Sequence, residues 1–430
     1  MTPPLARGAG KRRRVPIKVR QFPPPHLILW PGYAVGTPIW RLRRAYRIAW
    51  RRRFGLRDYL RTAVGWLLWP LISLVLALQA GIKLGGPVAR GGGPGVARQI
   101  AEQVWLAFAY RIVPRYYYIF ELHRPELRRR AAEYLTRAEC KSGVYRALKQ
   151  RGDRSKFVRI NDKLSFSSFF GRNGLKVVPV LAAFRAGLRV GNVGDGKLPE
   201  GQDLFVKKIE GRGGIGAEVW LAQPHGGYRS SRGAESRAEE LVAHVLELSK
   251  AGDYLIQPRL SNHPEIADLT PGALSTVRLL TILNEQGEPE AVNAAFRMAI
   301  SKASPVDNFH AGGIAAPVDL ATGTLGAATG LGLGGDFHWY ETHPLTGARI
   351  RDRRLPQWEA AVALAIAAHR LVAPRVMVGW DIGFLPDGPC LIEGNTGPDA
   401  DIHQRVELRP IGNARYGALL AWHLERRLGL

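Results

Sequence analysis

The sequence predicts an α+β domain from residue 155 to 430, behind a basic and largely helical N-terminal region. The chain has 430 residues, of which 46% are hydrophobic, so it is long enough for two or three domains and too apolar for a disordered tail. After residue 155, short apolar runs alternate with Gly-rich turns and helical stretches. The charge is uneven, because residues 1–61 hold 16 Lys and Arg against one acid within a chain of formal net charge +25.

The first 38 residues are expected to form a basic, flexible arm, because they mix prolines, glycines and basic residues without an apolar period. Prolines, instead of an apolar stretch, follow the charged residues, so the pattern is not that of a signal peptide.

From residue 39 the pattern changes. Ile39, Leu42, Tyr46 and Ala49 recur at steps of three and four, with arginines largely on the other side. This spacing predicts a basic amphipathic helix.

An uncharged stretch of 21 residues follows, between Arg61 and Lys83. Its length matches the roughly 20 residues that cross the hydrocarbon core of a bilayer. A single crossing would keep the Arg-rich flank in the cytoplasm and send the rest of the chain outside. Pro70, near the middle, suits a bent or re-entrant segment that returns to the same side. Three interpretations remain open: a segment that lies in the membrane plane or re-enters it, a helix buried against the catalytic body, and a membrane span.

Residues 84–97 are rich in Gly and Pro and are predicted to be a linker, which completes a second segment from 39 to 97. Apolar repeats then predict a helical region over residues 98–154. The two cysteines, Cys140 and Cys390, cannot form a disulfide framework and lack the spacing of a metal cluster. They indicate a reducing compartment.

The strongest signal for a functional site lies near the C-terminus. Two strand-like runs flank Asp387-Gly388, a pair that favours a hairpin turn. Counting outward from this turn, Asp381 and Glu393 face each other to within one residue, and Asn395 lies on the same face as Glu393. Two carboxylates and an amide oxygen suit Mg²⁺ that is shared with phosphates. An ordinary solvated hairpin is the alternative, but the neighbours are apolar, and buried acids need a cation, a proton or a partner.

A glycine-rich loop follows a short apolar strand that ends at Lys207. Glycines allow backbone N–H groups to approach phosphate oxygens, and a lysine on the adjoining strand supplies a point charge. The loop matches neither a Walker loop nor a GxGxxG turn, and a plain hairpin turn has the same pattern. Its glycines are Gly211, Gly213, Gly214 and Gly216.

Three further features place polar residues next to apolar strands. The run from 254 to 260 ends in polar residues where a purine could bond to the backbone, although a core strand has the same pattern. Arg278 and Arg297 each lie inside an apolar strand, and two arginines in one cleft would bind anions, whereas a single buried one often forms a structural ion pair. Asp307 and His310 precede a Gly-Gly turn, where polar residues are turn formers as often as catalytic groups.

Taken in order, these elements resemble those of ATP-grasp enzymes. The quoted elements are Lys163 in INDKLSF, Lys207 with its glycine loop, the strand at Ile256-Gln257, and Asp381 with Glu393 and Asn395. The chain is most similar to the sugar-transfer associated ATP-grasp family, whose typical elements resemble TVRLLTI, DNFHAGGI, VGWDIGFLPDGPCLIEGN and the Pro-Asp pair downstream. The similarity covers about residues 155–405 and not residues 1 to about 100. It implies a two-lobed ATP-grasp fold that holds ATP between α+β lobes.

The resemblance also implies roles for single residues. The phosphates of ATP would be contacted by Lys163 and Lys207 and covered by Gly211 to Gly216, the adenine would lie at Gln257, and one or two Mg²⁺ would be held by Asp381, Glu393 and Asn395. Arg278 would stabilise charge on the transferred phosphoryl group or on the tetrahedral intermediate. Beside the resemblance, Arg297 is the candidate for a second anion-binding arginine, and His310 is the candidate for a base or a substrate contact, with a structural role as the alternative. Lys208 and Pro258-Arg259 depart from the family pattern, in which a proline and a ribose-binding acid are commoner.

The implied activity is that of a carboxylate–amine ligase that works through an acylphosphate. The family's association with polysaccharide products implies a sugar-bearing or lipid-linked acceptor, and the basic N-terminal region would hold a cytoplasmic enzyme at the anionic inner face of the cell membrane. Two alternatives stay open: a kinase that acts on a hydroxyl, and an anionic-surface or nucleic-acid binding protein with a degenerate ATP site. No specific nucleic acid is expected, because the aromatic residues of the basic segment have apolar neighbours. The oligomeric state is open.

Overall fold

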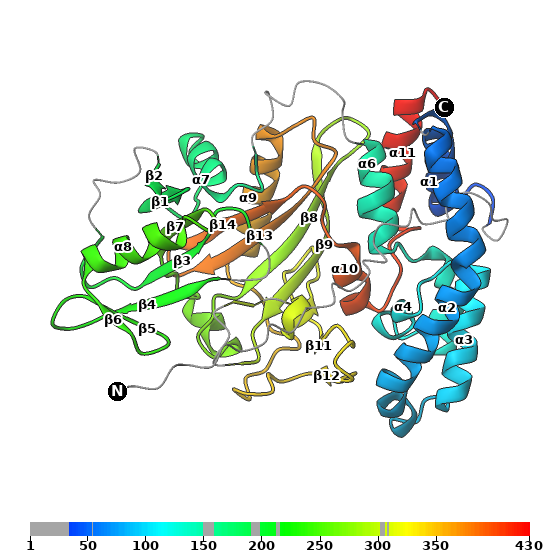
Figure 1. Cartoon of the computed structure of the whole chain (residues 1–430), viewed down its shortest axis with the longest axis horizontal. Coiled ribbons are helices and arrows are strands. Elements are labelled where there is room, and N and C mark those ends of the chain that lie inside the picture. The colour runs from blue at the N-terminus through cyan, green and yellow to red at the C-terminus, as the bar shows by residue number, and fades with distance from the viewer. Residues whose placement is uncertain are drawn as a thin grey trace, which may run out of the picture.

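Two antiparallel sheets form two lobes in the computed structural model (Figure 1). The structure describes residues 34–53, 55–148, 159–190, 198–211, 216–301, 306–307 and 309–430. The first sheet has the strand order β2-β1-β7-β3-β4-β5-β6 and the second has the order β12-β11-β10-β9-β8-β13-β14. The predicted basic arm, residues 1–38, lies almost wholly outside the described residues.

The strands of the first sheet are β1 (Ala182–Arg185), β2 (Leu188–Arg189), β3 (Leu204–Lys208), β4 (Glu218–Ala222), β5 (Tyr228–Ser230), β6 (Glu235–Ser236) and β7 (Tyr254–Pro258). Those of the second are β8 (Thr276–Leu283), β9 (Pro289–Met298), β10 (Ile314–Pro317), β11 (Ala328–Thr329), β12 (Trp339–Tyr340), β13 (Met377–Leu385) and β14 (Gly388–Asn395). The helices of this part are α7 (Lys163–Arg172), α8 (Ala238–Leu248), α9 (Trp358–Leu371), α10 (Ala400–Glu407) and α11 (Arg415–Leu428).

Successive side chains of a strand point to opposite faces of its sheet. Both faces carry buried apolar side chains, so helices cover each sheet. On the first sheet, Leu204 and Val206 of β3 pack against α8. On the second, Val277 and Leu279 of β8 lie in one core with α9, whereas Leu280 belongs to the core on the opposite face. The second sheet is therefore a rigid central layer, and its cleft-facing residues are held from both sides.

The opposite face of the second sheet is covered by α11 and by α1 (Pro38–Arg53), which lie side by side in Figure 1. The predicted apolar face of α1 is confirmed, because Ile39, Leu42 and Tyr46 are buried in a core with Leu280 of the sheet. Its charged face departs from the prediction at Arg43, which is also buried. The face of α1 that could enter a membrane is thus occupied by the protein's own core.

The uncharged stretch belongs to one long helix, α2 (Leu56–Arg90), which contains Pro70 and Pro87 and packs against α3 (Val96–Ala109). The helix extends through the first half of the predicted Gly/Pro linker, because its glycines serve close packing. A Cβ at Gly81 would lie 2.4 Å from Ile100 Cγ1, and one at Gly85 would lie 3.1 Å from Gln99 Oε1. Small residues at these positions let α3 approach the α2 backbone.

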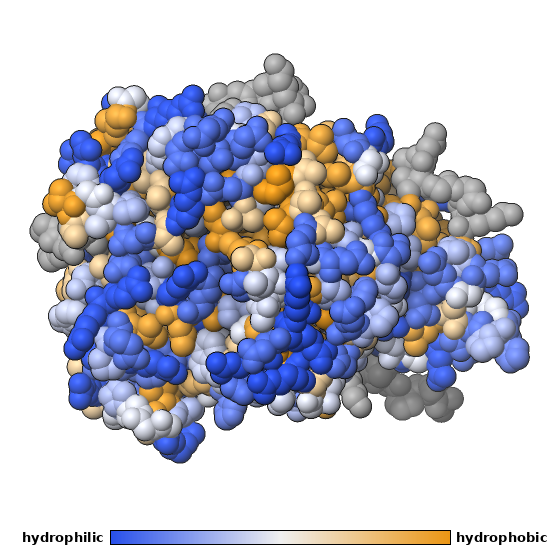
Figure 2. Space-filling view, turned by 180° about the vertical axis from the view of Figure 1, so that it is seen from behind, coloured by the Kyte–Doolittle hydropathy of each residue, from blue (hydrophilic) through white to orange (hydrophobic). Residues whose placement is uncertain are grey.

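Thr62–Arg90 is long and apolar enough to cross a membrane, with a mean hydropathy of 1.8 over its most apolar window, of which 22% is buried. Along this helix Leu67, Leu71 and Ile82 are 80%, 62% and 78% exposed. The interpretation as a helix buried against the catalytic body is therefore wrong for most of its described surface. The reverse face of the molecule, in Figure 2, is by contrast a mosaic of hydrophilic side chains with hydrophobic residues between them.

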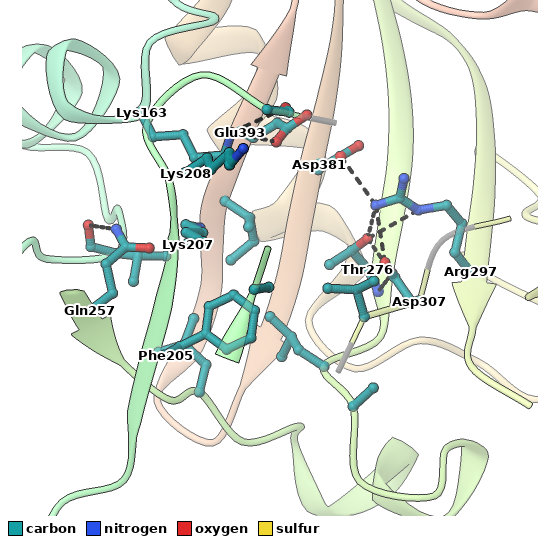
Figure 3. Close-up of a pocket in the computed structure, with 18 of the residues that line it drawn as sticks. Lys163, Phe205, Lys207, Lys208, Gln257, Thr276, Arg297, Asp307, Asp381 and Glu393 are labelled. Carbon is teal, nitrogen blue, oxygen red and sulfur yellow. Dashed lines mark hydrogen bonds and ion pairs between the residues drawn. The ribbon is translucent and has the colours of Figure 1, made fainter. Parts of the chain in front are cut away.

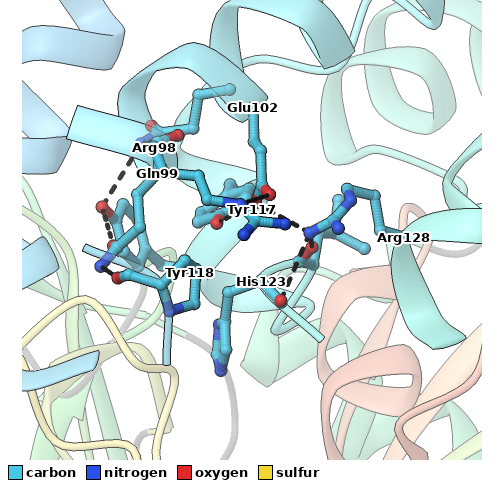
Figure 4. Close-up of polar contacts among 10 residues, drawn as sticks. Arg98, Gln99, Glu102, Tyr117, Tyr118, His123 and Arg128 are labelled. Carbon is cyan, nitrogen blue, oxygen red and sulfur yellow. Dashed lines mark hydrogen bonds and ion pairs between the residues drawn. The ribbon is translucent and has the colours of Figure 1, made fainter. Parts of the chain in front are cut away.

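The predicted helical region consists of short helices that follow α3. They are α4 (Arg115–Ile119), α5 (Pro125–Arg129), the 3₁₀ turn η3 (Ala131–Glu133), the π-helix η4 (Glu139–Val144) and α6 (Tyr145–Leu148). A polar network ties α3 to this region, since Glu102 accepts hydrogen bonds from Tyr117 Oη at 2.7 Å and from Arg128 Nη1 at 2.8 Å (Figure 4). These contacts fix the helices relative to one another without a long continuous helix.

Candidate active site

A cleft of about 1530 Å³ lies between the two sheets and is closed on one side by the helical region. Most of the predicted site residues line it: Lys163, Lys207, Gly211, Gln257, Arg278, Arg297, His310, Asp381, Glu393 and Asn395. Gly216 is not among the lining residues, and Gly213 and Gly214 lie outside the described residues. The sequence patterns therefore converge on one cavity, as the order of the motifs predicts.

The predicted C-terminal hairpin is confirmed. Strands β13 and β14 pair around Pro386-Asp387, so the turn lies one residue earlier than predicted, and a bulge between Asp381 and Ile382 brings Asp381 directly opposite Glu393. Asn395 is opposite Gly379, two positions along, so its side chain lies on the same face as that of Glu393. The two side chains meet, since Asn395 Nδ2 donates to Glu393 Oε1 at 3.2 Å.

Asp381 is held by both predicted arginines, which reach it from the neighbouring strands. Arg278 donates to it through Nε and Nη2, the latter at 2.9 Å from Oδ2, and Arg297 Nη2 lies 3.1 Å from the same oxygen. Burial alone would raise the pKa of Asp381, but these two cations lower it below its usual value. Asp381 is thus a charged carboxylate with two cationic partners.

A second buried acid, Asp307, completes this group (Figure 3). Its Oδ2 accepts hydrogen bonds from the backbone N–H and the Oγ1 of Thr276 at 2.8 and 2.6 Å, and its Oδ1 lies 3.4 Å from Arg297 Nη2. Burial raises the pKa of Asp307, and Arg297 offsets part of that rise. Thr276 was not predicted, and its position at the start of an apolar strand gives no signal in the sequence.

Three lysines lie on the side of the cleft that faces Glu393 (Figure 3). Lys163, at the start of α7, has its Nζ 3.7 Å from Glu393 Oε2 and 3.4 Å from the Ile209 carbonyl. The pKa of Lys207 is lowered to about 8, chiefly by burial and in part by Lys163, while Glu393 opposes the fall. Lys208, the departure from the family pattern, also lines the cleft.

The remaining predicted residues lie around these groups. Gln257, on β7, is buried and donates through Nε2 to the Val178 carbonyl at 3.3 Å. The loop between β3 and β4 ends at Gly216, where φ is +78° and a Cβ would lie 2.8 Å from Tyr254 Oη, so glycine is required. His310 Nε2 lies 3.6 Å from Asp401 Oδ2, which is buried beneath it.

The cleft also contains residues of the helical region that the sequence analysis did not select. Arg137 and Lys141 line it together with Asp399, to which both are ion-paired. Asp399 belongs to the Pro-Asp pair of the family pattern, but the two cations stand more than 250 positions earlier in the chain. A local pattern cannot show that such distant residues share a cavity.

The donor set of the hairpin suits a divalent cation bound to phosphates. Glu393 and Asn395 offer a carboxylate and an amide oxygen on one face, the ligand types that Mg²⁺ prefers. Lysines face them across the cleft, as polyphosphate binding needs. Asp381 contributes a carboxylate whose oxygens already accept hydrogen bonds from two arginines, so its part in metal binding stays a prediction.

The fold and this cleft define a protein of the ATP-grasp type. The profile of the sugar-transfer associated ATP-grasp family matches residues 146–411, which is more than half of the chain. The protein therefore belongs to the sugar-transfer associated ATP-grasp family. No curated protein matches the chain.

Solved structures with a similar fold share little sequence. D-Alanyl-alanine synthetase A from Vibrio cholerae has 10% identity and a TM-score of 0.36, over 63% of this chain and 66% of that one. The D-alanine–D-alanine ligase from Bacillus anthracis complexed with ATP has 13% identity and a TM-score of 0.34, over 63% and 67%. N5-carboxyaminoimidazole synthase from Aspergillus clavatus, in complex with ADP and 5-aminoimidazole ribonucleotide, has 10% and 0.31, over 60% and 54%. Since the chain spans about two thirds or less of these proteins, their activities do not transfer directly to it.

Proposed function

We propose that the protein is an ATP-dependent ligase that joins a carboxylate to an amine through an acylphosphate, and that it modifies a cell-surface polysaccharide or its precursor. The observation that carries this proposal is the cleft itself, in which Lys163 and Lys207 face Glu393 and Asn395 while Arg278 and Arg297 lie alongside. Cations for a polyphosphate and hard oxygens for a divalent ion meet there in one cavity. The named neighbours that bind ATP or ADP have the same general fold.

Each residue group has a role in this proposal. Lys163 and Lys207 bind the phosphates of ATP under the loop that contains Gly211 to Gly216, and the adenine lies beside Gln257. Asp381, Glu393 and Asn395 hold Mg²⁺, which when bound neutralises charge on the transferred phosphoryl group. Arg278 and Arg297, fixed by Asp381, present positive charge to the same group.

The reaction follows from simple chemistry. A carboxylate oxygen of the substrate attacks the γ-phosphorus of ATP, the bond to the β-phosphate oxygen breaks, and ADP leaves. The acylphosphate is an activated acyl donor, so the amine attacks its carbonyl carbon and inorganic phosphate leaves with the bonding electrons. The amine loses one proton in this step, and His310, oriented by Asp401, accepts it. Positioning by fixed charges supplies most of the catalysis, and no protein nucleophile is needed.

The test of this proposal is production of ADP, screened against pairs of candidate carboxylates and amines. We expect ADP and free phosphate in equal amounts when both substrates are present. Phosphate that stays on the acceptor would instead identify a kinase, and the absence of nucleotide turnover with every pair would contradict the proposal. ADP is the readout for every pair, because any carboxylate that is activated in this way releases it.

The affinity for ATP is expected to fall as the pH rises through about 8, because burial holds the pKa of Lys207 there. Bound phosphates stabilise the protonated amine and raise its pKa, so above about pH 8 binding must take up a proton. The affinity should then fall by up to about tenfold per pH unit until the pKa of the complex is reached. Titration with a non-hydrolysable ATP analogue between about pH 6.5 and 9.5 measures this effect.

Lys207→Arg is the matched variant for that titration, since an arginine stays protonated throughout the range. Its affinity should change little with pH, whereas Lys176→Arg, which alters a lysine bound to the hairpin turn at Asp387, should keep the wild-type profile. A wild-type affinity that is constant across the range would remove Lys207 from the phosphate site.

We further propose that the exposed apolar face of α2 and α3 lies in the plane of an anionic membrane. The exposed residues recur at helical spacing along α2, among them Leu67, Leu71 and Leu78, and exposed Trp105 and Phe108 continue the surface on α3. Exposed cations stand at both ends of α2, and the exposed apolar residues follow one another along the helix instead of being scattered singly. The cations are Arg51, Arg52, Arg57, Lys83 and Arg90.

Replacing Leu67 and Leu71 by Asn should weaken binding to anionic vesicles by roughly 10²- to 10⁴-fold, because each leucine contributes about 1.5–3 kcal/mol when it is buried in the interface. Co-sedimentation with vesicles that contain phosphatidylglycerol measures the partition coefficient. Leu345→Asn, at a residue that is 53% exposed on the catalytic part, is the control and should bind as the wild type does. Equal binding of the double variant would show that α2 does not contact the lipid.

A further inference from the structure

One wall of the cleft is formed by residues that precede the part matched by the family profile, which begins at residue 146. Arg137 lies just before η4 and Lys141 lies within it, and both side chains line the cleft. They are 25% and 27% exposed, so they are accessible from the cleft and still supported by the protein. This wall is separate from the lysines that face Glu393.

Both cations contact the same oxygen. Arg137 Nε and Lys141 Nζ each lie 2.8 Å from Asp399 Oδ1. Asp399 precedes α10 but its side chain does not cap that helix, because it is directed at the two cations. Arg137 and Lys141 also lower the pKa of the buried Asp401, so two carboxylates face the two positive charges. A guanidinium has five N–H donors and an ammonium three, so the pair can bind a second anion without leaving Asp399.

Contacts with other parts of the protein hold Arg137 and Lys141 in position. Glu139, between the two residues in sequence, is buried and accepts a hydrogen bond from Arg43 Nε of α1 at 2.6 Å. The backbone N–H of Arg137 donates to Tyr116 Oη at 3.0 Å. The segment is therefore preorganised, and an arriving anion does not have to order it.

A metal ion is a poor occupant for this part of the cleft. His310, Asp399 and Asp401 offer ligand atoms within 4.8 Å of one another. The two cations are more accessible from the cleft than the carboxylates of Asp399 and Asp401, which are 13% and 5% exposed, and this favours an anion instead.

We propose that Arg137 and Lys141 form a subsite that binds a phosphate or carboxylate group of the acceptor substrate. The proposal rests on the proposed function and names the anionic character of its substrate. The phosphate can belong to a sugar phosphate or to the headgroup of a lipid-linked sugar, since both present the same oxygens to the pair. The N-terminal region thus contributes directly to substrate recognition.

The test uses the full-length protein with its nucleotide site saturated by a non-hydrolysable ATP analogue and Mg²⁺. Inorganic phosphate is then titrated by calorimetry into the wild type and into the Arg137→Gln/Lys141→Gln variant. We expect the variant to bind phosphate at least about tenfold more weakly, with unchanged affinity for the analogue. The control, Arg349→Gln/Arg351→Gln, neutralises two exposed arginines that pair with Glu341 outside the cleft and should bind phosphate as the wild type does.

Competition distinguishes the source of the phosphate. Displacement by glucose 1-phosphate supports a sugar phosphate, and displacement by dihexanoyl phosphatidic acid supports a lipid headgroup. Displacement by neither, or equal phosphate affinity in the double variant and the wild type, overturns the subsite while nucleotide binding still supports the enzyme. A wild type that does not bind the ATP analogue overturns the proposed function, and the subsite with it.

Discussion

Replacing Glu393 by Gln and Asn395 by Ala is expected to abolish Mg-ATP turnover while the fold remains intact. The two side chains lie on one face of the confirmed hairpin and offer the hard oxygens that Mg²⁺ requires. Loss of a metal that stabilises transferred phosphate costs several kcal/mol of transition-state energy, which corresponds to roughly 10³-fold in rate. ADP release under saturating ATP measures the effect, with circular dichroism as the check on folding.

The variant has an additional consequence at Lys207. Glu393 raises the pKa of Lys207. The Glu393→Gln change removes this negative charge, so the fall in ATP affinity should move to a lower pH. Glu341→Gln, which changes an exposed acid away from the cleft, is the control and should keep full turnover. Turnover within twofold of the wild type in the double variant would remove the metal assignment from the hairpin.

Replacing Arg43 by Met is expected to cost about 3–5 kcal/mol in the free energy of unfolding, because it leaves the Glu139 carboxylate buried without its cation. The same change removes the hydrogen bond from Arg43 Nη1 to the Ala132 carbonyl at 2.7 Å. Urea denaturation followed by circular dichroism measures the loss. The loss in the free energy of unfolding should be large, although the sequence alone predicts that Arg43 lies on the exposed, charged face of its helix.

Two further variants test whether the loss of stability comes from the Arg43–Glu139 ion pair or from any substitution on α1. Arg44→Met changes the neighbouring exposed arginine and should alter the free energy of unfolding by less than about 0.5 kcal/mol. Arg43→Met combined with Glu139→Gln should recover most of the loss, since no uncompensated charge is then buried. If Arg43→Met is as stable as Arg44→Met, the pair has no structural role.

The sequence predicts the C-terminal hairpin to within one residue because most of its geometry is local. The two-residue turn is Pro386-Asp387, one residue earlier than predicted, and the period of two in a strand then sets which side chains share a face. A bulge between Asp381 and Ile382, for which the sequence gives no signal, shifts the register by one residue and places Asp381 opposite Glu393. Similarly, the spacing of Ile39, Leu42 and Tyr46 predicts the buried face of α1, although it does not show what covers it.

Features that depend on distant partners could not be predicted in this way. The burial of Arg43 requires Glu139, which is 96 residues away, and the cleft wall at Arg137 requires Asp399, which comes near the end of the part that the family profile matches. The Gly/Pro stretch after Lys83 was expected to be a linker because glycine usually breaks helices, but here the missing side chains admit α3. The composition of a segment indicates which secondary structure it prefers, but packing against another segment decides the conformation that it adopts.

Trapping with hydroxylamine tests most directly whether the cleft makes an acylphosphate. Hydroxylamine replaces the unknown amine, so only the carboxylate must be supplied with Mg-ATP. We predict that ADP, free phosphate and the hydroxamate of that carboxylate form in equal amounts, and that none forms with the Glu393→Gln/Asn395→Ala variant. ADP formation by the wild type with phosphate retained on the acceptor and no hydroxamate would contradict the proposed ligase activity.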